Sequence, residues 1–159
     1  MAVINFDNVS KFNVNKNEKE LICSNKPLLH EIEKVYGYGT VVDIIHAYLF
    51  KFQASLSIKD EYKLDASQMA LCANNMIPFL RALTISEIVM MFKRFLSGEF
   101  GRFYGNIDIM VLGEWVRQFK RKRGELILDN PDVRKYIVKR DQNFNEDKAS
   151  WRDEETKNP

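Results

Sequence analysis

The fold is decided by residues 83–123, which read LTISEIVMMFKRFLSGEFGRFYGNIDIMVLGEWVRQFKRKR. Thr84 and Glu87 have the spacing of a capping box, in which the threonine hydroxyl and the glutamate carboxylate each accept a hydrogen bond from a backbone amide at a helix N-terminus. Apolar residues then recur every three or four positions as far as Leu96, which predicts a helix with one apolar face. We expect Gly98 to follow the end of this helix.

A second helix is predicted to begin near Asp108, because a carboxylate interacts favourably with the positive end of the helix dipole. This helix carries Trp115 among its apolar positions and closes in a basic turn, which suits the negative end of the dipole. We expect Gly124 to end it. The apolar faces of the two helices predict a shared core in which Trp115 faces Phe92.

The two helices are joined by residues 97–107, SGEFGRFYGNI, here called the connector. Three of eight successive positions are glycine (Gly98, Gly101 and Gly105), which indicates positive φ angles or close packing. Three further positions are aromatic: Phe100, Phe103 and Tyr104. Flexible linkers lack such large side chains, so we predict an ordered connector whose aromatic residues are pinned to the core. The alternative is that these rings, with Arg102, stack on single-stranded nucleic acid.

The basic residues are unevenly distributed along a chain whose net charge is only +2. Residues 117–123, here called the basic run, hold five cations in seven positions. One interpretation is that these cations solvate a helix C-terminus and interact with its dipole. The other is a phosphate-contacting face on one side of the helix, from which Lys122 and Arg123 project away as plain surface charge. The candidate nucleic-acid contacts are Arg102, Arg117, Lys120 and Arg121.

Two helices are predicted before residue 55. The first follows Pro27, and its apolar face includes Val35 and Tyr36. The second is capped by Thr40, and its apolar positions cover so wide an arc that we expect it to be central and nearly buried.

Two more helices lie on either side of the deciding stretch. Asp65 and Gln68 repeat the capping-box spacing and begin a helix that Pro78 is expected to bend or end. Pro131 opens a last amphipathic helix, because proline favours the first helical position. The pattern therefore predicts an all-α protein with five to six helices and no sheet.

The 159 residues, of which 45% are hydrophobic, are enough for one domain with a sizeable core. We expect a single compact helical bundle over residues 26–140. Residues 1–25 are expected to form a partly disordered N-terminal arm, and residues 141–159 a charged, flexible C-terminal tail. No apolar run approaches the roughly 18 to 20 residues of a membrane span, and the N-terminus lacks a signal peptide pattern. We therefore expect cytoplasmic residence.

The sequence contains no motif of a known catalytic mechanism: it has no phosphate-binding loop, no nucleophile elbow and no zinc-protease helix. Cys23 and Cys72 are expected to be buried thiols, and His30 and His46 to be core or boundary residues. Their wide spacing does not favour a metal site. We expect a non-enzymatic protein without a metal or other cofactor.

Several motifs follow one another in a fixed order: Leu83-Thr84, the run GEFGRFYG at residues 98–105, Ile107-Asp108, Trp115 and the basic run. In this order they resemble an uncharacterised family of small helical proteins encoded in phages and mobile elements of Bacteroides-like bacteria. The resemblance covers about residues 65–123 and includes no catalytic motif. It implies a helical protein and a role in phage or plasmid DNA metabolism.

Two functions are therefore expected. The first is that of a non-enzymatic phage or mobile-element accessory protein, such as a DNA-replication or helicase-loader-like adaptor that binds nucleic acid weakly. The alternative is a protein-interaction module without nucleic-acid binding, either a virion or assembly component or an inhibitor of a host protein. A protein partner and no membrane are expected in both cases, within the host cytoplasm. Salt-dependent binding to single-stranded DNA distinguishes the two.

Overall fold

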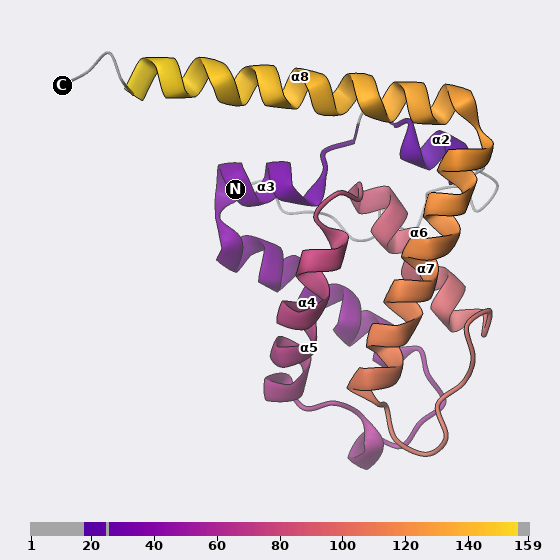
Figure 1. Cartoon of the computed structure of the whole chain (residues 1–159). Coiled ribbons are helices and arrows are strands. Elements are labelled where there is room, and N and C mark those ends of the chain that lie inside the picture. The colour runs from indigo at the N-terminus through magenta and orange to yellow at the C-terminus, as the bar shows by residue number, and fades with distance from the viewer. Residues whose placement is uncertain (1–17, 25, 156–159) are drawn as a thin grey trace. The chain divides into compact units, whose positions relative to one another are not determined.

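The computed structural model describes residues 18–24 and 26–155, with side chains as far as residue 143. Over these residues it contains seven α-helices, one short 3-10 helix and no strand, so the predicted all-α fold is confirmed (Figure 1). The chain divides into two compact units, Met1–Lys122 and Arg123–Pro159. Within the described ranges, no helix is both long and apolar enough to cross a membrane.

The first helix of the described chain, α2 (Glu18–Ile22), was not predicted. It lies within the segment that we expected to be an N-terminal arm, and it buries Leu21 and Ile22. Residues 1–17 and 25 of that arm lie outside the described residues.

The next two helices, α3 (Leu29–Tyr36) and α4 (Tyr38–Ala54), are separated by Gly37, whose φ of 89° interrupts the helical backbone. Thr40 does not cap α4 as predicted, because the helix begins two residues earlier and the threonine hydroxyl donates to the Tyr36 carbonyl. The predicted apolar face of α3 is wrong at Val35 and Tyr36, which are exposed at the end of the helix. As predicted, α4 is central, since it packs against α3, α5 and α6.

Both predicted capping boxes are present. Helix α5 (Ala66–Leu80) begins with the reciprocal hydrogen bonds of Asp65 and Gln68, and α6 (Ile85–Leu96) begins with those of Thr84 and Glu87. Pro78 lies in the last turn of α5, which continues to Leu80. The helix persists there because the proline lacks only one amide donor close to a helix end. A 3-10 turn, η1 (Asp60–Tyr62), precedes α5.

Helix α7 (Ile109–Asp129) begins as predicted, with Asp108 Oδ1 accepting a 2.8 Å hydrogen bond from the amide of Met110. The predicted end at Gly124 is wrong, because α7 continues to Asp129. A glycine ends a helix when it adopts a positive φ, and Gly124 is not among the glycines that do so. In the helix interior it only lowers the helix propensity by about 1 kcal/mol.

The second unit consists of the last turns of α7 and the helix α8 (Pro131–Glu155). Asn130 joins them: its side-chain Nδ2 donates to the Leu126 carbonyl at 2.7 Å, and its carbonyl accepts from the amide of Arg134 at 3.1 Å. Pro131 opens α8 as predicted. The helix runs on to Glu155, within the segment that we expected to be a flexible tail, and residues 156–159 lie outside the described chain.

An aromatic cluster occupies the core of the first unit. Phe95 lies at its centre: the centroid of its ring is 5.8 Å from that of Phe92 and 5.5 Å from that of Trp115. Phe92 contacts Tyr48 and Phe52 on α4, at 6.1 and 5.7 Å. The prediction that Trp115 faces Phe92 is therefore wrong in detail, although both rings are buried in one core.

Candidate functional site

The connector is held against the core by two of its three aromatic rings. The Phe103 ring lies 4.7 Å from Trp115, and the Phe100 ring meets Phe95 edge to face at 5.5 Å. The predicted positive φ angles are confirmed: 79° at Gly98, 132° at Gly101 and 87° at Gly105. A Cβ on Gly101 would lie in ordinary contact with the Trp115 ring, 3.6 Å from its Nε1, so the backbone angle is what favours glycine there.

Tyr104 is not pinned to the core, and in this respect the prediction is wrong. Its side chain is 95% exposed, whereas Phe103, one position earlier, occupies the space against Trp115. Arg102 is also exposed. The connector therefore has an inner aromatic side that fixes it and an outer side that presents one ring and one cation to solvent.

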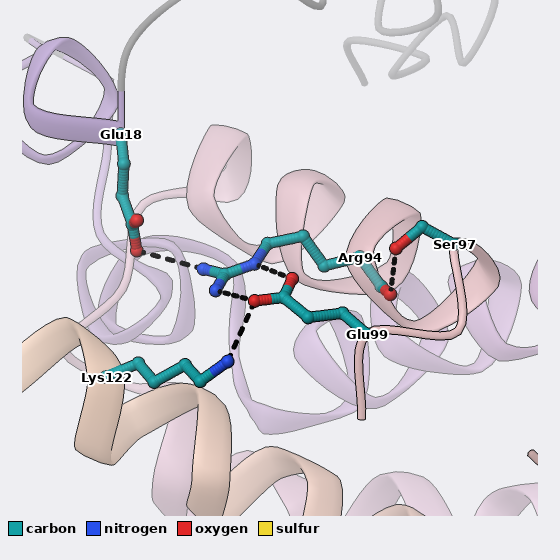
Figure 2. Close-up of polar contacts among 5 residues, drawn as sticks. All are labelled: Glu18, Arg94, Ser97, Glu99 and Lys122. Atoms are coloured by element: carbon teal, nitrogen blue, oxygen red, sulfur yellow. Dashed lines mark hydrogen bonds and ion pairs between the residues drawn. The ribbon is translucent and has the colours of Figure 1, made fainter. Parts of the chain in front are cut away.

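Four charged side chains fix the start of the connector (Figure 2), and we call them the Glu99 cluster. They are Glu18 of α2, Arg94 of α6, Glu99 of the connector and Lys122 of α7. Arg94 donates to both carboxylate oxygens of Glu99 at 2.6 Å and to Glu18 Oε1 at 3.2 Å. Lys122 Nζ donates to Glu99 Oε1 at 2.9 Å. Hydrogen bonds between charged groups, and bidentate arginine–carboxylate pairs in particular, are stronger than hydrogen bonds between neutral groups.

The cluster shifts the titration of its own members. The hydrogen bonds from Arg94, followed by the one from Lys122, lower the pKa of Glu99 to about 2, and the hydrogen bonds to Glu99 raise the pKa of Arg94. Both cations also lie over the Phe100 ring, with Lys122 Nζ 4.9 Å and Arg94 Cζ 5.4 Å from its centroid. The cluster thus links α2, α6 and α7 to the connector. The cluster was not predicted from the sequence. Arg94 and Glu99 are five residues apart, but Glu18 and Lys122 are far from them along the chain.

The basic run does not present one continuous cationic face. Lys122 belongs to the Glu99 cluster and Arg123 is buried at 8% exposure, so the prediction that both are plain surface charge is wrong. Arg117 pairs with Glu114, whose Oε2 lies 3.3 Å from the arginine Nε. The remaining predicted nucleic-acid contacts are Arg102 and Arg121, which are exposed, and Lys120, which is half-buried.

A mostly apolar groove of about 360 Å³ lies between α5 and α7, and we call it the α5–α7 groove. Its lining includes Cys72, Met76 and Phe79 from α5, and Met110, Gly113 and Arg117 from α7. Met110 is 81% exposed and Phe79 is 38% exposed, although both are large and apolar. Of the described residues that line the groove, Arg117 is the only charged one. Sequence reasoning missed this groove, because it depends on which faces of two distant helices meet.

Among the described residues, no group of three or more His, Cys, Asp or Glu side chains is placed to hold a metal ion. Cys72 is buried as predicted, and burial raises the pKa of its thiol to about 11, whereas Cys23 is only half-buried. His30 Nδ1 lies 3.0 Å from the Arg81 carbonyl. His46 lines a second surface hollow, of about 780 Å³, beside the exposed ring of Phe50.

Comparison with known proteins identifies a family. Residues 54–143 match a family of unknown function (DUF6633), and this segment contains α5, α6, the connector and α7 in full. No curated protein and no solved structure matches the chain. The predicted resemblance to an uncharacterised helical family is confirmed to this extent, while its origin in phages and mobile elements stays a prediction. Because the match covers more than half of its residues, the chain belongs to this family of unknown function.

Proposed function

We propose that this protein is a non-enzymatic protein-interaction module that docks a partner through the α5–α7 groove. The observation that carries this proposal is Met110, an apolar side chain left 81% exposed at the edge of an apolar hollow. Exposed apolar surface beside a concave site is typical of protein-binding surfaces. The groove also lies entirely within residues 54–143, the segment that matches the family.

The charges favour this function over nucleic-acid binding by the basic run. Nucleic-acid affinity depends on how many phosphates are neutralised by available cations. Two of the five cations in the run are held within the protein: Lys122 pairs with Glu99, and Arg123 is buried at 8% exposure. The second hollow is a weaker candidate, because most of its lining precedes residue 54, where the family match begins.

The resemblance found in the sequence supplies the setting of this proposal. It supports a phage- or mobile-element-encoded accessory protein that acts in the host cytoplasm, as an assembly component or as an inhibitor of a host protein. Neither role requires a metal, a cofactor or a catalytic residue.

Co-purification with matched variants tests the docking function. The tagged wild type, Met110→Glu and Leu128→Glu are expressed in the native host, and bound proteins are quantified with and without nuclease treatment. Leu128 is a suitable control because it is an apolar residue of the same helix and is 67% exposed. We expect a partner that survives nuclease and is lost only with Met110→Glu. Equal recovery by all three proteins would refute docking at the groove.

A weak nucleic-acid adaptor, as in DNA replication, is the second candidate function. Its support is the outer side of the connector, where the 95% exposed Tyr104 ring lies two positions from the exposed Arg102. An aromatic ring next to a cation is the usual platform for unstacked bases. Loss of salt-dependent binding to single-stranded DNA on changing Tyr104 to Ala tests this candidate, and equal binding by both proteins would refute it.

A further inference from the structure

We infer that the occupant of the α5–α7 groove is an amphipathic helix of a partner protein that places a carboxylate against Arg117. This inference rests on the proposed docking function and names the chemistry of the partner. Three features of the groove carry it: its length, the presence of Gly113 in its lining, and Arg117, the one charged residue among the described residues that line it.

The length of the groove matches the repeat of a helix. Its α5 residues extend from Cys72 to Phe79, and its α7 residues from Ile109 to Arg117. These stretches advance seven and eight residues, or about 10 to 12 Å at 1.5 Å per residue. A docked helix places apolar anchors at i, i+3 or i+4, and i+7, which also span about 10 Å. Two turns of a helix therefore fit the groove from end to end.

Gly113 lies near the middle of the α7 stretch that lines the groove. A glycine inside a helix costs about 1 kcal/mol relative to alanine, so its presence here opposes local stability. On the side of α7 that lines the groove, Gly113 lies between Met110 and Arg117 and contributes no side chain. A Cβ placed on Gly113 would lie 3.8 Å from Arg117 Nη2, so the guanidinium group lies beside this glycine.

Arg117 supplies the charge that selects the partner. None of the described residues that line the groove is acidic, and the side chains of Arg117 and Glu114 are each 56% exposed. Among the described residues, Glu114 engages the Nε of Arg117 at 3.3 Å. A guanidinium group recognises a carboxylate best through two parallel N–H donors, a geometry that this single contact does not use. A partner helix with an apolar stripe and an adjacent Asp or Glu complements both the groove and its cation.

A peptide selection identifies the charge preference directly. The probe is a displayed library of amphipathic helical peptides of about 16 residues, because shorter isolated helices are marginal in water. Positions beside the apolar stripe are randomised among acidic, basic and neutral residues. The library is selected on the full chain as wild type, Arg117→Glu, Met110→Glu and Arg121→Glu. Arg121 is the matched control, since it is an exposed arginine of the same helix that does not line the groove.

We expect the wild type to recover peptides with Asp or Glu at one recurrent position beside the stripe. These peptides should bind Arg117→Glu about tenfold more weakly, which corresponds to about 1.4 kcal/mol, and Arg121→Glu unchanged. Selection on Arg117→Glu should instead recover Lys or Arg at that position.

Three other results would overturn the inference. Peptides that lose binding with Met110→Glu but not with Arg117→Glu would overturn the acidic partner while leaving the docking function intact. A library without any Met110-dependent peptide would overturn both. If sedimentation shows that the wild type self-associates and Met110→Glu does not, the occupant is a second copy of this chain and the inference is wrong.

Discussion

Replacing Glu99 with Gln tests whether the Glu99 cluster fastens the connector to the helices around it. The substitution keeps the size of the side chain but removes the charge that accepts from Arg94 and Lys122. Both cations then remain beside the Phe100 ring without the carboxylate that holds them there. We therefore expect a loss of stability that depends on pH.

The pKa of Glu99 sets the size and the sign of this loss. The pKa falls from 4.5 to about 2 on folding, and at 1.36 kcal/mol per pKa unit this sets an upper bound of about 3 kcal/mol. The Glu99 side chain is 32% exposed, so screening by solvent reduces the expected value to about 1 to 2 kcal/mol. Because the pKa is lowered by folding, this stability is fully present above about pH 4.5 and is lost as the pH falls toward 2.

Urea unfolding of the wild type and Glu99→Gln between acidic and neutral pH measures the difference. The two proteins should differ by about 1 to 2 kcal/mol at neutral pH and converge at the acid end of the range. Glu114→Gln is the control, because its carboxylate pairs with Arg117 at the surface and should contribute less than about 0.5 kcal/mol. A difference that is the same at every pH, or as large for Glu114→Gln, would refute the reasoning.

Three further predictions concern the core, the connector and the basic run. Truncating the buried Trp115 to Ala should cost about 3 to 5 kcal/mol, and an unchanged melting temperature would contradict the core. Gly101→Ala should destabilise by about 1 kcal/mol or more, because φ is 132° there, whereas Gly39→Ala at an open helical position should be neutral or stabilising. In fluorescence anisotropy with a labelled single-stranded oligonucleotide, the wild type and a variant with Gln at Arg117, Lys120 and Arg121 should show the same binding. Salt-sensitive binding by the wild type that is lost in the variant would favour the nucleic-acid adaptor.

Features that depend on neighbouring residues were predictable from the sequence. The capping boxes at Thr84 and Asp65 were predicted correctly because each is completed within three positions. The positive φ angles of the connector followed from its glycines, since backbone angles depend on the local residue type. Helix ends were less predictable: Gly124 permits a helix to end but does not force it to do so.

Features that depend on distant residues were not predictable. Arg94 and Glu18 lie 76 positions apart, and Lys122 and Glu99 lie 23 apart, so no local pattern indicates that they meet. The same limit applies to the α5–α7 groove, whose two walls come from separate helices. The basic run was predicted as one charged surface because its cations are close together in the sequence. In the structure these cations differ in burial and in pairing.

Site-specific photo-crosslinking tests directly whether a protein partner docks in the α5–α7 groove. A photo-reactive amino acid replaces Met110 in one protein and Leu128 in another, two exposed apolar positions of α7. Both proteins are irradiated in the native host, and the extracts are treated with nuclease before the adducts are analysed. We expect a discrete protein adduct from position 110 and none from position 128. Adducts of equal yield from both positions, or adducts from position 110 that disappear with nuclease, would contradict it.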